Sequence, residues 1–430
     1  MSLECFRYED LVKGEDLAGV AERAFGHEGL GIAVVTGVPG IAEARRELFA
    51  LGHKFATLPE EARARYEHPT SSFSFGWSHG KETLEAGRPD LAKGSFYANP
   101  CFDAPFGEGK AAAGGGGETA EPESAPAAAA VAAEAVARYP SFAHPNIWPD
   151  SDVPGFSGAF KKLGRAVVRV GELVARQCDG YVAAVHPGYE EGKMARIVSS
   201  SRCPKGRLLH YFPRRDSPLE GGRGAGAGAG GGGAAGEGGA VTATMADDAD
   251  SGRDGTAGDD GGGGEDDGAF SDWCGWHHDH SSLTGLVPAM FLDAEGREVA
   301  NGDPKCGLYI RSRDQGELVK ATLPRGEPAS SCLLFQIGET TQALSGGALQ
   351  ATPHAVRSTS QEGVSREAFA VFMQPEWAES MDVPRGAQLS SVRSLHSKSL
   401  LPRESAPITE RLRPGMDFGE FTDATFAAYY

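Results

Sequence analysis

Cysteine is scarce and unpaired in this sequence, and long apolar runs are missing from its N-terminus. Seven cysteines, an odd number, are spread over 430 residues without a C-x-x-C pair. This pattern favours free thiols in a reducing compartment over a disulfide framework. The first ten residues include four charged ones and no apolar run, so we expect neither a signal peptide nor a membrane span. We therefore predict a cytoplasmic protein, with a nucleocytoplasmic location as the alternative.

Basic stripes are also missing, although the net charge is strongly negative. The formal net charge is -18, and half of it lies in residues 220–267, which hold 11 acidic residues and 2 arginines, or -9. The rest of the chain is only mildly acidic. Without a basic surface there is no sign of a phosphate-backbone partner, so we expect no nucleic acid to bind.

Two segments have too few large apolar side chains to pack. In residues 220–267, 19 of 48 residues are glycine, and such a segment cannot bury enough surface to offset its ordering entropy. We predict that it is disordered, and that the Ala/Gly-rich residues 111–137 form a shorter insertion. About 350 residues remain, which suits one domain with a helical annex. The predicted organisation is an N-terminal region (1–110), the first insertion (111–137), a bracing helix and first core strand (138–219), the second insertion (220–267), a catalytic core (268–380) and a C-terminal extension (381–430).

The first half of the chain alternates helix and strand signals. Apolar periodicity predicts helices over residues 11–25 and 42–55, a buried strand over 31–36, and a short helix starting near residue 58. The clearest helix follows at residues 156–181, where apolar side chains recur every three or four positions. One apolar stripe of about seven turns should brace a sheet.

Strand signals dominate the second half. The candidate strands are residues 207–212, 283–292, 307–311, 317–322, 331–337, 349–357 and 367–374. Many short strands after a helical half predict a mainly β fold: a double-stranded β-helix (jelly roll) core with an N-terminal α/β region and helices packed outside.

The most informative motif is Trp276-His277-His278-Asp279. On a strand, His277 and Asp279 would point to the same face, because strand side chains alternate. Two neutral imidazoles and one carboxylate form the facial triad of mononuclear non-haem iron oxygenases, and His354, 75 residues beyond Asp279, is the candidate third ligand. His278 and His280 should point to the opposite face.

The blocks around these residues resemble the 2-oxoglutarate and Fe(II)-dependent dioxygenase superfamily, in particular its isopenicillin N synthase-like branch of plants and algae. Residues 276–284 (WHHDHSSLT) are similar to the W-H-x-D-x-x-x-L-T block of that branch, and 307–310 (GLYI) to its G-L-x-V strand. Further similar blocks are residues 29–39, 335–347, 353–356 and 366–372. The resemblance runs from about residue 4 to 377, apart from the two insertions.

The resemblance implies a small-molecule enzyme with iron and 2-oxoglutarate. His277, Asp279 and His354 would bind Fe(II), and Arg366 would bind the distal carboxylate of 2-oxoglutarate through its planar guanidinium. Dioxygen would then be consumed as 2-oxoglutarate is decarboxylated and a small organic substrate is oxidised, with hydroxylation as the usual outcome. We expect no membrane partner and a monomer.

Two positions depart from the family pattern near Arg366. The serine expected two residues later is Ala368, and the N-x-Y motif of an early strand corresponds to His210-Tyr-Phe212. His210, Tyr211 or Tyr309 is the candidate replacement for the lost hydroxyl groups. The departures leave open a 2-oxoglutarate-independent ferrous oxidase. A non-catalytic barrel scaffold is a further alternative, although the intact set of three metal ligands argues against it. A hydrolytic zinc site fits poorly, because its leading histidine would be Gly275.

Overall fold

The computed structural model describes residues 3–81, 83–84, 88–105, 133–213, 274–312, 317–388, 392 and 407–429. The predicted insertion at 220–267 and most of the one at 111–137 lie outside these residues. The described helices include α1 (Tyr8–Lys13), α2 (Ala18–Phe25), α3 (Ile41–Ala56), α4 (Glu60–Ala64), α6 (Pro140–Ala143), α7 (Phe156–Val185), α8 (Lys193–Ser200), α9 (Glu339–Leu344), α10 (Ile408–Arg411) and α11 (Phe418–Tyr429). The described strands are β1 (Glu4–Arg7), β2 (Ile32–Thr36), β3 (Gly76–His79), β4 (Thr83–Leu84), β5 (Arg88–Pro89), β6 (Lys93–Ala98), β7 (Lys205–Tyr211), β8 (Cys274–His277), β9 (Leu283–Leu292), β10 (Glu298–Val299), β11 (Gly307–Arg311), β12 (Leu318–Lys320), β13 (Leu333–Ile337), β14 (His354–Arg357) and β15 (Ser365–Met373).

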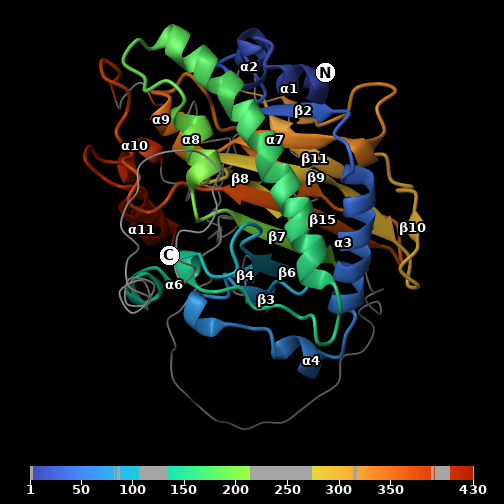
Figure 1. Cartoon of the computed structure of the whole chain (residues 1–430). Helices are drawn as coiled ribbons and strands as arrows, with labels where there is room; N and C mark the ends of the chain where they lie inside the picture. The colour runs from blue at the N-terminus through green and yellow to red at the C-terminus, as the bar shows by residue number, and fades with distance from the viewer. Residues whose placement is uncertain are drawn as a thin grey trace, which may run out of the picture.

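Two main sheets with helices on the outside make up the fold, and β4 pairs with β5 in a small third sheet. The larger sheet has nine strands, in the order β1-β2-β13-β9-β15-β7-β6-β3 with β10 beside β9, and the smaller has the order β12-β11-β14-β8. The strands β9 and β11 have the predicted bounds, and β7, β12, β13 and β15 differ from the predicted bounds by at most two residues at either end. The strand β14 begins five residues later than predicted. The fold is therefore rich in mixed sheet with helices, as the sequence predicts (Figure 1).

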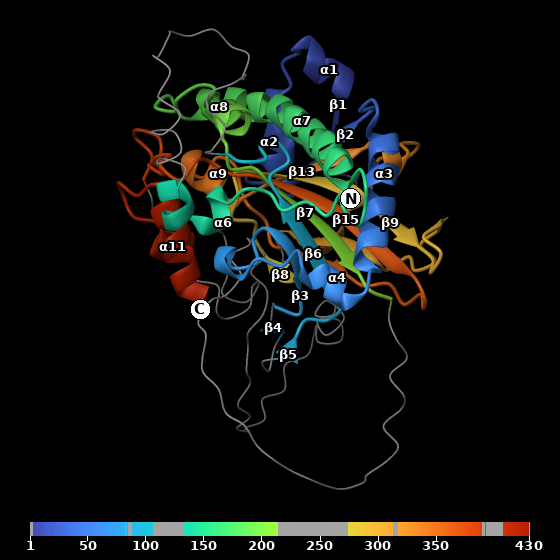
Figure 2. The same cartoon turned by 60° about the horizontal axis from the view of Figure 1, so that its bottom comes forward.

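The long predicted helix is α7, and it braces the nine-stranded sheet together with α3. Figure 1 shows both helices crossing the same face of the sheet, and Figure 2 shows that face from another side. A Cβ atom added at Gly171 of α7 would come within 2.5 Å of the Met373 sulfur, and one at Gly285 of β9 within 2.2 Å of a Val167 methyl. The helix and sheet therefore pack so closely that only glycine fits at these positions.

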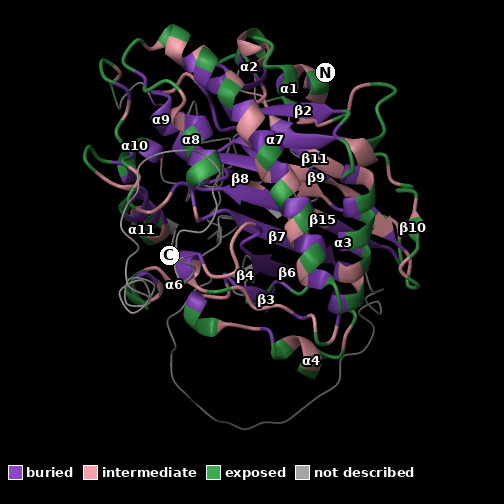
Figure 3. Ribbon diagram, viewed as in Figure 1, coloured by how far each residue is buried: buried purple, intermediate pink, exposed green. Residues whose placement is uncertain are grey.

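Burial follows the two-sheet arrangement. In Figure 3 the strands are mostly buried, whereas α7 alternates between buried and exposed positions along its length, as a helix with one apolar stripe must. The predicted single helix over residues 11–25 is wrong in one respect, because it is two helices. Gly14 ends α1 with a φ of 73°, and its N–H donates to the Leu11 carbonyl, so the chain turns before α2 begins.

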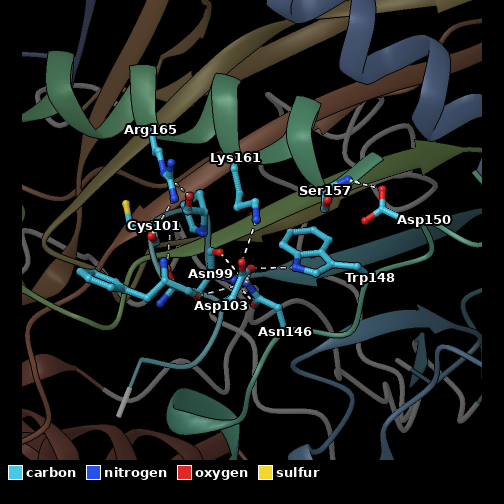
Figure 4. Close-up of polar contacts among 11 residues, drawn as sticks. Asn99, Cys101, Asp103, Asn146, Trp148, Asp150, Ser157, Lys161 and Arg165 are labelled. Carbon is cyan, nitrogen blue, oxygen red and sulfur yellow. Dashed lines mark hydrogen bonds and ion pairs between the residues drawn. The ribbon is translucent and has the colours of Figure 1, made fainter. Parts of the chain in front are cut away.

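The chain that follows β6 is fastened to α7 by polar contacts. The carboxylate of Asp103 accepts hydrogen bonds from Asn146, Trp148 and Lys161, at 3.1, 2.7 and 2.7 Å (Figure 4). Arg165, one turn further along α7, donates to the carbonyls of residues 100 and 101. These contacts fix the end of β6, the strand that carries Lys93 at its start.

Among the helices that the structure describes, none is both long enough and apolar enough to cross a membrane.

Candidate active site

Three predicted metal ligands, His277, Asp279 and His354, lie together. The Nε2 atoms of both histidines are 3.8 Å from Oδ1 of Asp279, and one ligand atom from each residue lies within 4.8 Å of the other two. All three side chains are buried. Separations of 3.8 Å are too long for hydrogen bonds, but they leave room for an ion between the three groups.

Neighbouring strands of the smaller sheet position the two histidines. His354 begins β14 and lies directly opposite His277, the last residue of β8. The Nδ1 atom of His277 is 2.8 Å from the Gly275 carbonyl, and that of His354 is 3.1 Å from the Thr352 carbonyl. A carbonyl only accepts hydrogen bonds, so in each neutral ring Nδ1 carries the proton and Nε2 keeps its lone pair for a metal.

Burial keeps both imidazoles neutral. It lowers the pKa of His354, with a further contribution from His277, to about 4. Burial likewise lowers the pKa of His277; Asp279 opposes this effect, and the cations Lys93 and Arg207 add to it. A metal ligand must be unprotonated, so these electrostatics suit the two rings for that role.

Asp279 lies just beyond the end of β8, in the turn before β9. Its carbonyl accepts a hydrogen bond of 2.8 Å from the backbone N–H of Glu339, the first residue of α9. Its Oδ2 atom is buried and has no hydrogen-bond partner in the part of the chain that the structure describes. A buried carboxylate oxygen left in this way costs free energy unless a cation compensates it, so the donor set fits a divalent metal.

His278 and His280 point away from this cluster, as the sequence predicts, towards the carboxylate of Glu339. The ring nitrogens are 3.7 and 3.9 Å from that carboxylate, which is also bound by Arg411 at 2.6 Å. Burial alone would raise the pKa of Glu339, but the Arg411 guanidinium and the two imidazoles hold it well below its ordinary value. The C-terminal segment thereby supports the turn that carries Asp279, a role that sequence reasoning missed.

The three candidate ligands line a cavity of about 290 Å³ between the two sheets. Much of the lining is apolar, including Leu286, Leu308, Leu334 and Phe369. The charged lining residues that the structure describes are Asp279 and three cations, Lys93, Arg207 and Arg366. A mostly apolar pocket with a few convergent polar groups is typical of a small-molecule site.

Arg366 lies in this cavity, where the sequence predicts a carboxylate-binding arginine. It is on β15, directly opposite Tyr211 on β7, and its guanidinium lies 4.8 Å from the centre of the Tyr211 ring. Ala368 lines the cavity two residues further along the strand. Tyr211 therefore lies beside Arg366 on the wall of the same cavity.

The other two residues predicted to help Arg366 point out of the cavity. His210 faces the opposite side of the nine-stranded sheet, where its Nδ1 is 2.6 Å from Glu367. The Tyr309 hydroxyl donates to the Lys305 carbonyl at 2.6 Å, and its ring packs with Trp276 and Ala355 on the outside of the smaller sheet. His210 and Tyr309, which we expected to contact the cosubstrate, therefore do not line the cavity that holds Arg366, whereas Tyr211 does.

The physical reason for this correction is the strand period. Side chains alternate along β7, so Arg207, Leu209 and Tyr211 share the inner face while His210 does not.

A second cluster of two histidines and a carboxylate lies outside the cavity. His53 on α3, His210 and Glu367 bring their ligand atoms within 4.8 Å of one another. We call His53, His210 and Glu367 the outer cluster, and His277, Asp279 and His354 the inner cluster. Glu367 is fully buried, and its Oε1 is 2.6 Å from His210 and 3.6 Å from His53.

No protein-family model matches the chain, and no curated protein matches its sequence. Solved structures match it in fold. A protein of Caulobacter crescentus assigned to the 2OG-Fe(II) oxygenase family has a TM-score of 0.55 and 15% identity, covering 99% of this chain and 98% of that one. A full-length Neurospora crassa protein, solved in complex with α-ketoglutarate and thymine, has a TM-score of 0.55 and 16% identity, covering 100% and 97%.

A third structure of this kind is JOX2 in complex with 2OG, Fe and JA. It has a TM-score of 0.51 and 14% identity, and the match covers 97% of this chain and 83% of that one. The Neurospora crassa protein and JOX2 bind 2-oxoglutarate, and JOX2 also binds iron; the present chain has a His-Asp-His group that could hold a metal. The chain thus has the fold of these 2OG-Fe(II) oxygenase structures.

Proposed function

We propose that this protein is an Fe(II)- and 2-oxoglutarate-dependent oxygenase, and that its two sheets form the double-stranded β-helix of that superfamily. The observation that carries the proposal is the shared cavity: the inner cluster and Arg366 both line it. His277, Asp279 and His354 would hold the iron, and Arg366 and Tyr211 would hold the far carboxylate of 2-oxoglutarate.

The reaction class follows from these groups. Bound iron would supply the activation of dioxygen. In the overall balance 2-oxoglutarate loses CO₂ and becomes succinate, one oxygen atom enters succinate, and the other oxidises the substrate, most simply from C–H to C–OH. The chain's own residues bind and orient: the guanidinium of Arg366 fixes one end of 2-oxoglutarate, and the apolar lining limits access of water.

Ala368 and Phe212, the two departures from the family pattern, favour a ferrous oxidase that does not use 2-oxoglutarate. Tyr211 weakens the case for such an oxidase, because its side chain lies beside Arg366 on the wall of the cavity. Anaerobic calorimetry of 2-oxoglutarate into the iron-loaded protein separates the two. We expect micromolar binding that Arg366→Leu removes.

The direct test is turnover. Purified protein would be incubated with Fe(II), ascorbate, dioxygen and labelled 2-oxoglutarate, and labelled succinate would be measured. We expect succinate from the wild-type protein and none above background from His354→Ala or Asp279→Asn. Equal succinate from the wild type and both variants, or no succinate from wild type across a broad substrate screen, would contradict the proposal.

A further inference from the structure

The cavity wall carries a glutamine whose amide oxygen is buried. Gln336 lies on β13, is only 3% exposed and lines the cavity. Its Oε1 atom has no hydrogen-bond partner in the part of the chain that the structure describes. A buried amide oxygen without a donor costs free energy, so this atom, on the wall of a cavity, points to a ligand that donates a hydrogen bond to it.

The neighbours of Gln336 on the sheet do not supply that donor. On one side it pairs with Ile32 of β2, whose side chain is apolar, and on the other with Thr284 of β9. The Thr284 hydroxyl lies 2.9 Å from the hydroxyl of Ser281, in the turn before β9. Leu334, two residues earlier on the same face of β13, is apolar. The remaining side of Gln336 is the cavity itself.

Gln336 lies at the metal end of the cavity. Directly after the turn that carries Asp279, Leu283 pairs with Ile337, and both side chains pack in the core on the face of the sheet that α7 covers. The next pair, Thr284 with Gln336, is therefore the first one past this turn that faces the cavity. A molecule bound by Gln336 would lie close to the metal site.

The position proposed for the far carboxylate of 2-oxoglutarate lies at the other end. Phe372 pairs with Thr284 and continues the row of Gln336 across the sheet, and Arg366 lies six residues before Phe372 on β15. Six residues span about 20 Å along a strand. The short chain of 2-oxoglutarate, held by Arg366 and the metal, would therefore leave Gln336 to a second molecule.

The row from Gln336 to Phe372 combines an amide with an aromatic ring. All three residues of the row line the cavity, and the row is about 10 Å wide at the usual strand spacing. The neighbouring pair on the same wall, Leu334 and Leu286, is apolar. Such a wall fits a small ring that has one polar edge, for the amide, and an otherwise apolar surface.

We propose that the substrate is a small cyclic amide, a lactam, whose N–H donates to Oε1 of Gln336 while its carbonyl accepts a hydrogen bond from Nε2. The amide of Gln336 has one acceptor and one donor side by side, and the cis N–H and carbonyl of a lactam complement that pair. This inference rests on the proposed function, because the lactam would occupy the cavity together with 2-oxoglutarate. A cavity of about 290 Å³ limits both molecules to small sizes.

The test compares lactams with lactones of the same shape, in which an oxygen atom replaces the ring N–H. Wild-type protein saturated with Fe(II) and 2-oxoglutarate under argon would be titrated with 2-pyridone, 2-pyranone, 2-quinolone and coumarin, with calorimetry as the readout. We expect each lactam to bind at least ~10-fold more tightly than its lactone, because the lactone leaves Oε1 of Gln336 without a donor. Equal affinities within the pairs, or no binding of either lactam, would overturn the proposal.

Three variants locate the effect. Gln336→Leu should abolish the preference for lactams while leaving 2-oxoglutarate affinity within about two-fold, and Gln336→Asn, which keeps the amide on a shorter side chain, should restore part of the preference. Gln350→Leu is the matched control, because Gln350 is also 3% exposed, also has an Oε1 without a partner among the described residues, and does not line the cavity. It should keep the full preference.

Survival of the lactam preference in Gln336→Leu would overturn the assignment. A fall in 2-oxoglutarate affinity of more than ~10-fold in that variant would also overturn it, because Gln336 would then bind the cosubstrate. The far-ultraviolet circular dichroism of each variant would be compared with wild type, and Gln336→Met, whose side chain has the same length, is the second variant should Gln336→Leu fail to fold. Failure of the proposed function would look different, because 2-oxoglutarate itself would then not bind to the iron-loaded wild-type protein.

Discussion

The inner and outer clusters have the same composition, two histidines and one carboxylate, but different surroundings. In the inner cluster the closest approaches between histidine and carboxylate are 3.8 Å, and both histidines use their Nδ1 atoms on backbone carbonyls. In the outer cluster the Glu367 carboxylate is already 2.6 Å from His210 Nδ1. In both clusters one carboxylate oxygen, Oδ2 of Asp279 or Oε2 of Glu367, is buried without a hydrogen-bond partner among the described residues. The inner arrangement keeps both Nε2 atoms for a metal, whereas the outer one already uses one histidine nitrogen on the carboxylate.

Location separates the clusters further. The inner cluster lines a cavity that also contains Arg366. The outer cluster lies on the helix-covered face of the nine-stranded sheet, where His53 reaches from α3 to Glu367 and Ser365. Residue type and spacing therefore do not distinguish a metal site from a buried structural network; hydrogen bonds to the ring nitrogens and access to a cavity do.

The largest expected difference between the clusters is in metal binding. His354→Ala and Asp279→Asn should lower the affinity for Co(II), a spectroscopic substitute for Fe(II), by more than ~100-fold, because each removes a ligand. His53→Ala and His210→Ala, the matched controls from the outer cluster, should leave one bound Co(II) per chain. Loss of Co(II) binding in the outer variants instead would reverse the assignment of the two clusters.

The next largest effect is on 2-oxoglutarate affinity, and it compares two residues that line the cavity with one that points out of it. Arg366→Leu should weaken 2-oxoglutarate binding by roughly 100-fold and Tyr211→Phe by roughly 10-fold, since each removes hydrogen bonds to a carboxylate. Tyr309→Phe should have little effect, because its hydroxyl bonds to Lys305 outside the cavity. Calorimetry on the iron-loaded protein measures all three. A greater loss of 2-oxoglutarate affinity in Tyr309→Phe than in Tyr211→Phe would contradict the assignment of Tyr211 to the cosubstrate site.

Variants of the outer cluster should change the free energy of unfolding and leave the metal content unchanged. Burial alone would raise the pKa of Glu367, but His210 and His53 lower it overall. A carboxyl whose pKa is lowered by folding stabilises the fold above its ordinary pKa of 4.5 and loses this contribution as the pH falls through the folded value.

Glu367→Gln should therefore lower the free energy of unfolding at pH 7 by about 2 kcal/mol. Urea unfolding at several pH values would measure this, and the difference from wild type should shrink below pH 4.5. A difference that stays constant from neutral pH down to well below that value would mean that the charge of Glu367 is not the cause.

The smallest expected effect is on metal affinity, from the residues that support the Asp279 turn without being ligands. Arg411→Met removes the guanidinium that binds Glu339, whose backbone N–H holds the Asp279 carbonyl. Metal affinity should fall by about 10-fold, as for other residues that orient ligands. Arg413→Met, an exposed neighbour, is the control. Equal Co(II) affinities in the two variants would mean that the C-terminal segment does not support the turn that carries Asp279.

Much of the core could be predicted from local sequence. The strands β9 and β11 have the predicted bounds, and α7 begins at the predicted Phe156, because their periodicity is strong over several residues. The inner cluster and Arg366 were found through motif order. Each lies on a strand or the turn after it, where short-range pattern decides which way a side chain points.

The missed features depend on long-range pairing. Lys93 and Arg207 are ordinary cations in the sequence, and only the pairing of β6 with β7 places them on one cavity wall. Arg411 reaches Glu339 across 72 residues, which no local pattern signals. His210 and Tyr309 lie outside the cavity because the face to which a strand residue points is fixed by how its strand pairs in the sheet.

The most direct test of the two-cluster account is a crystal structure of the protein soaked anaerobically with Fe(II) and 2-oxoglutarate, with an anomalous difference map collected at the iron edge. The account predicts one strong peak between His277 Nε2, Asp279 and His354 Nε2, with 2-oxoglutarate reaching Arg366. An iron peak between His53, His210 and Glu367, with none at the inner cluster, would contradict it.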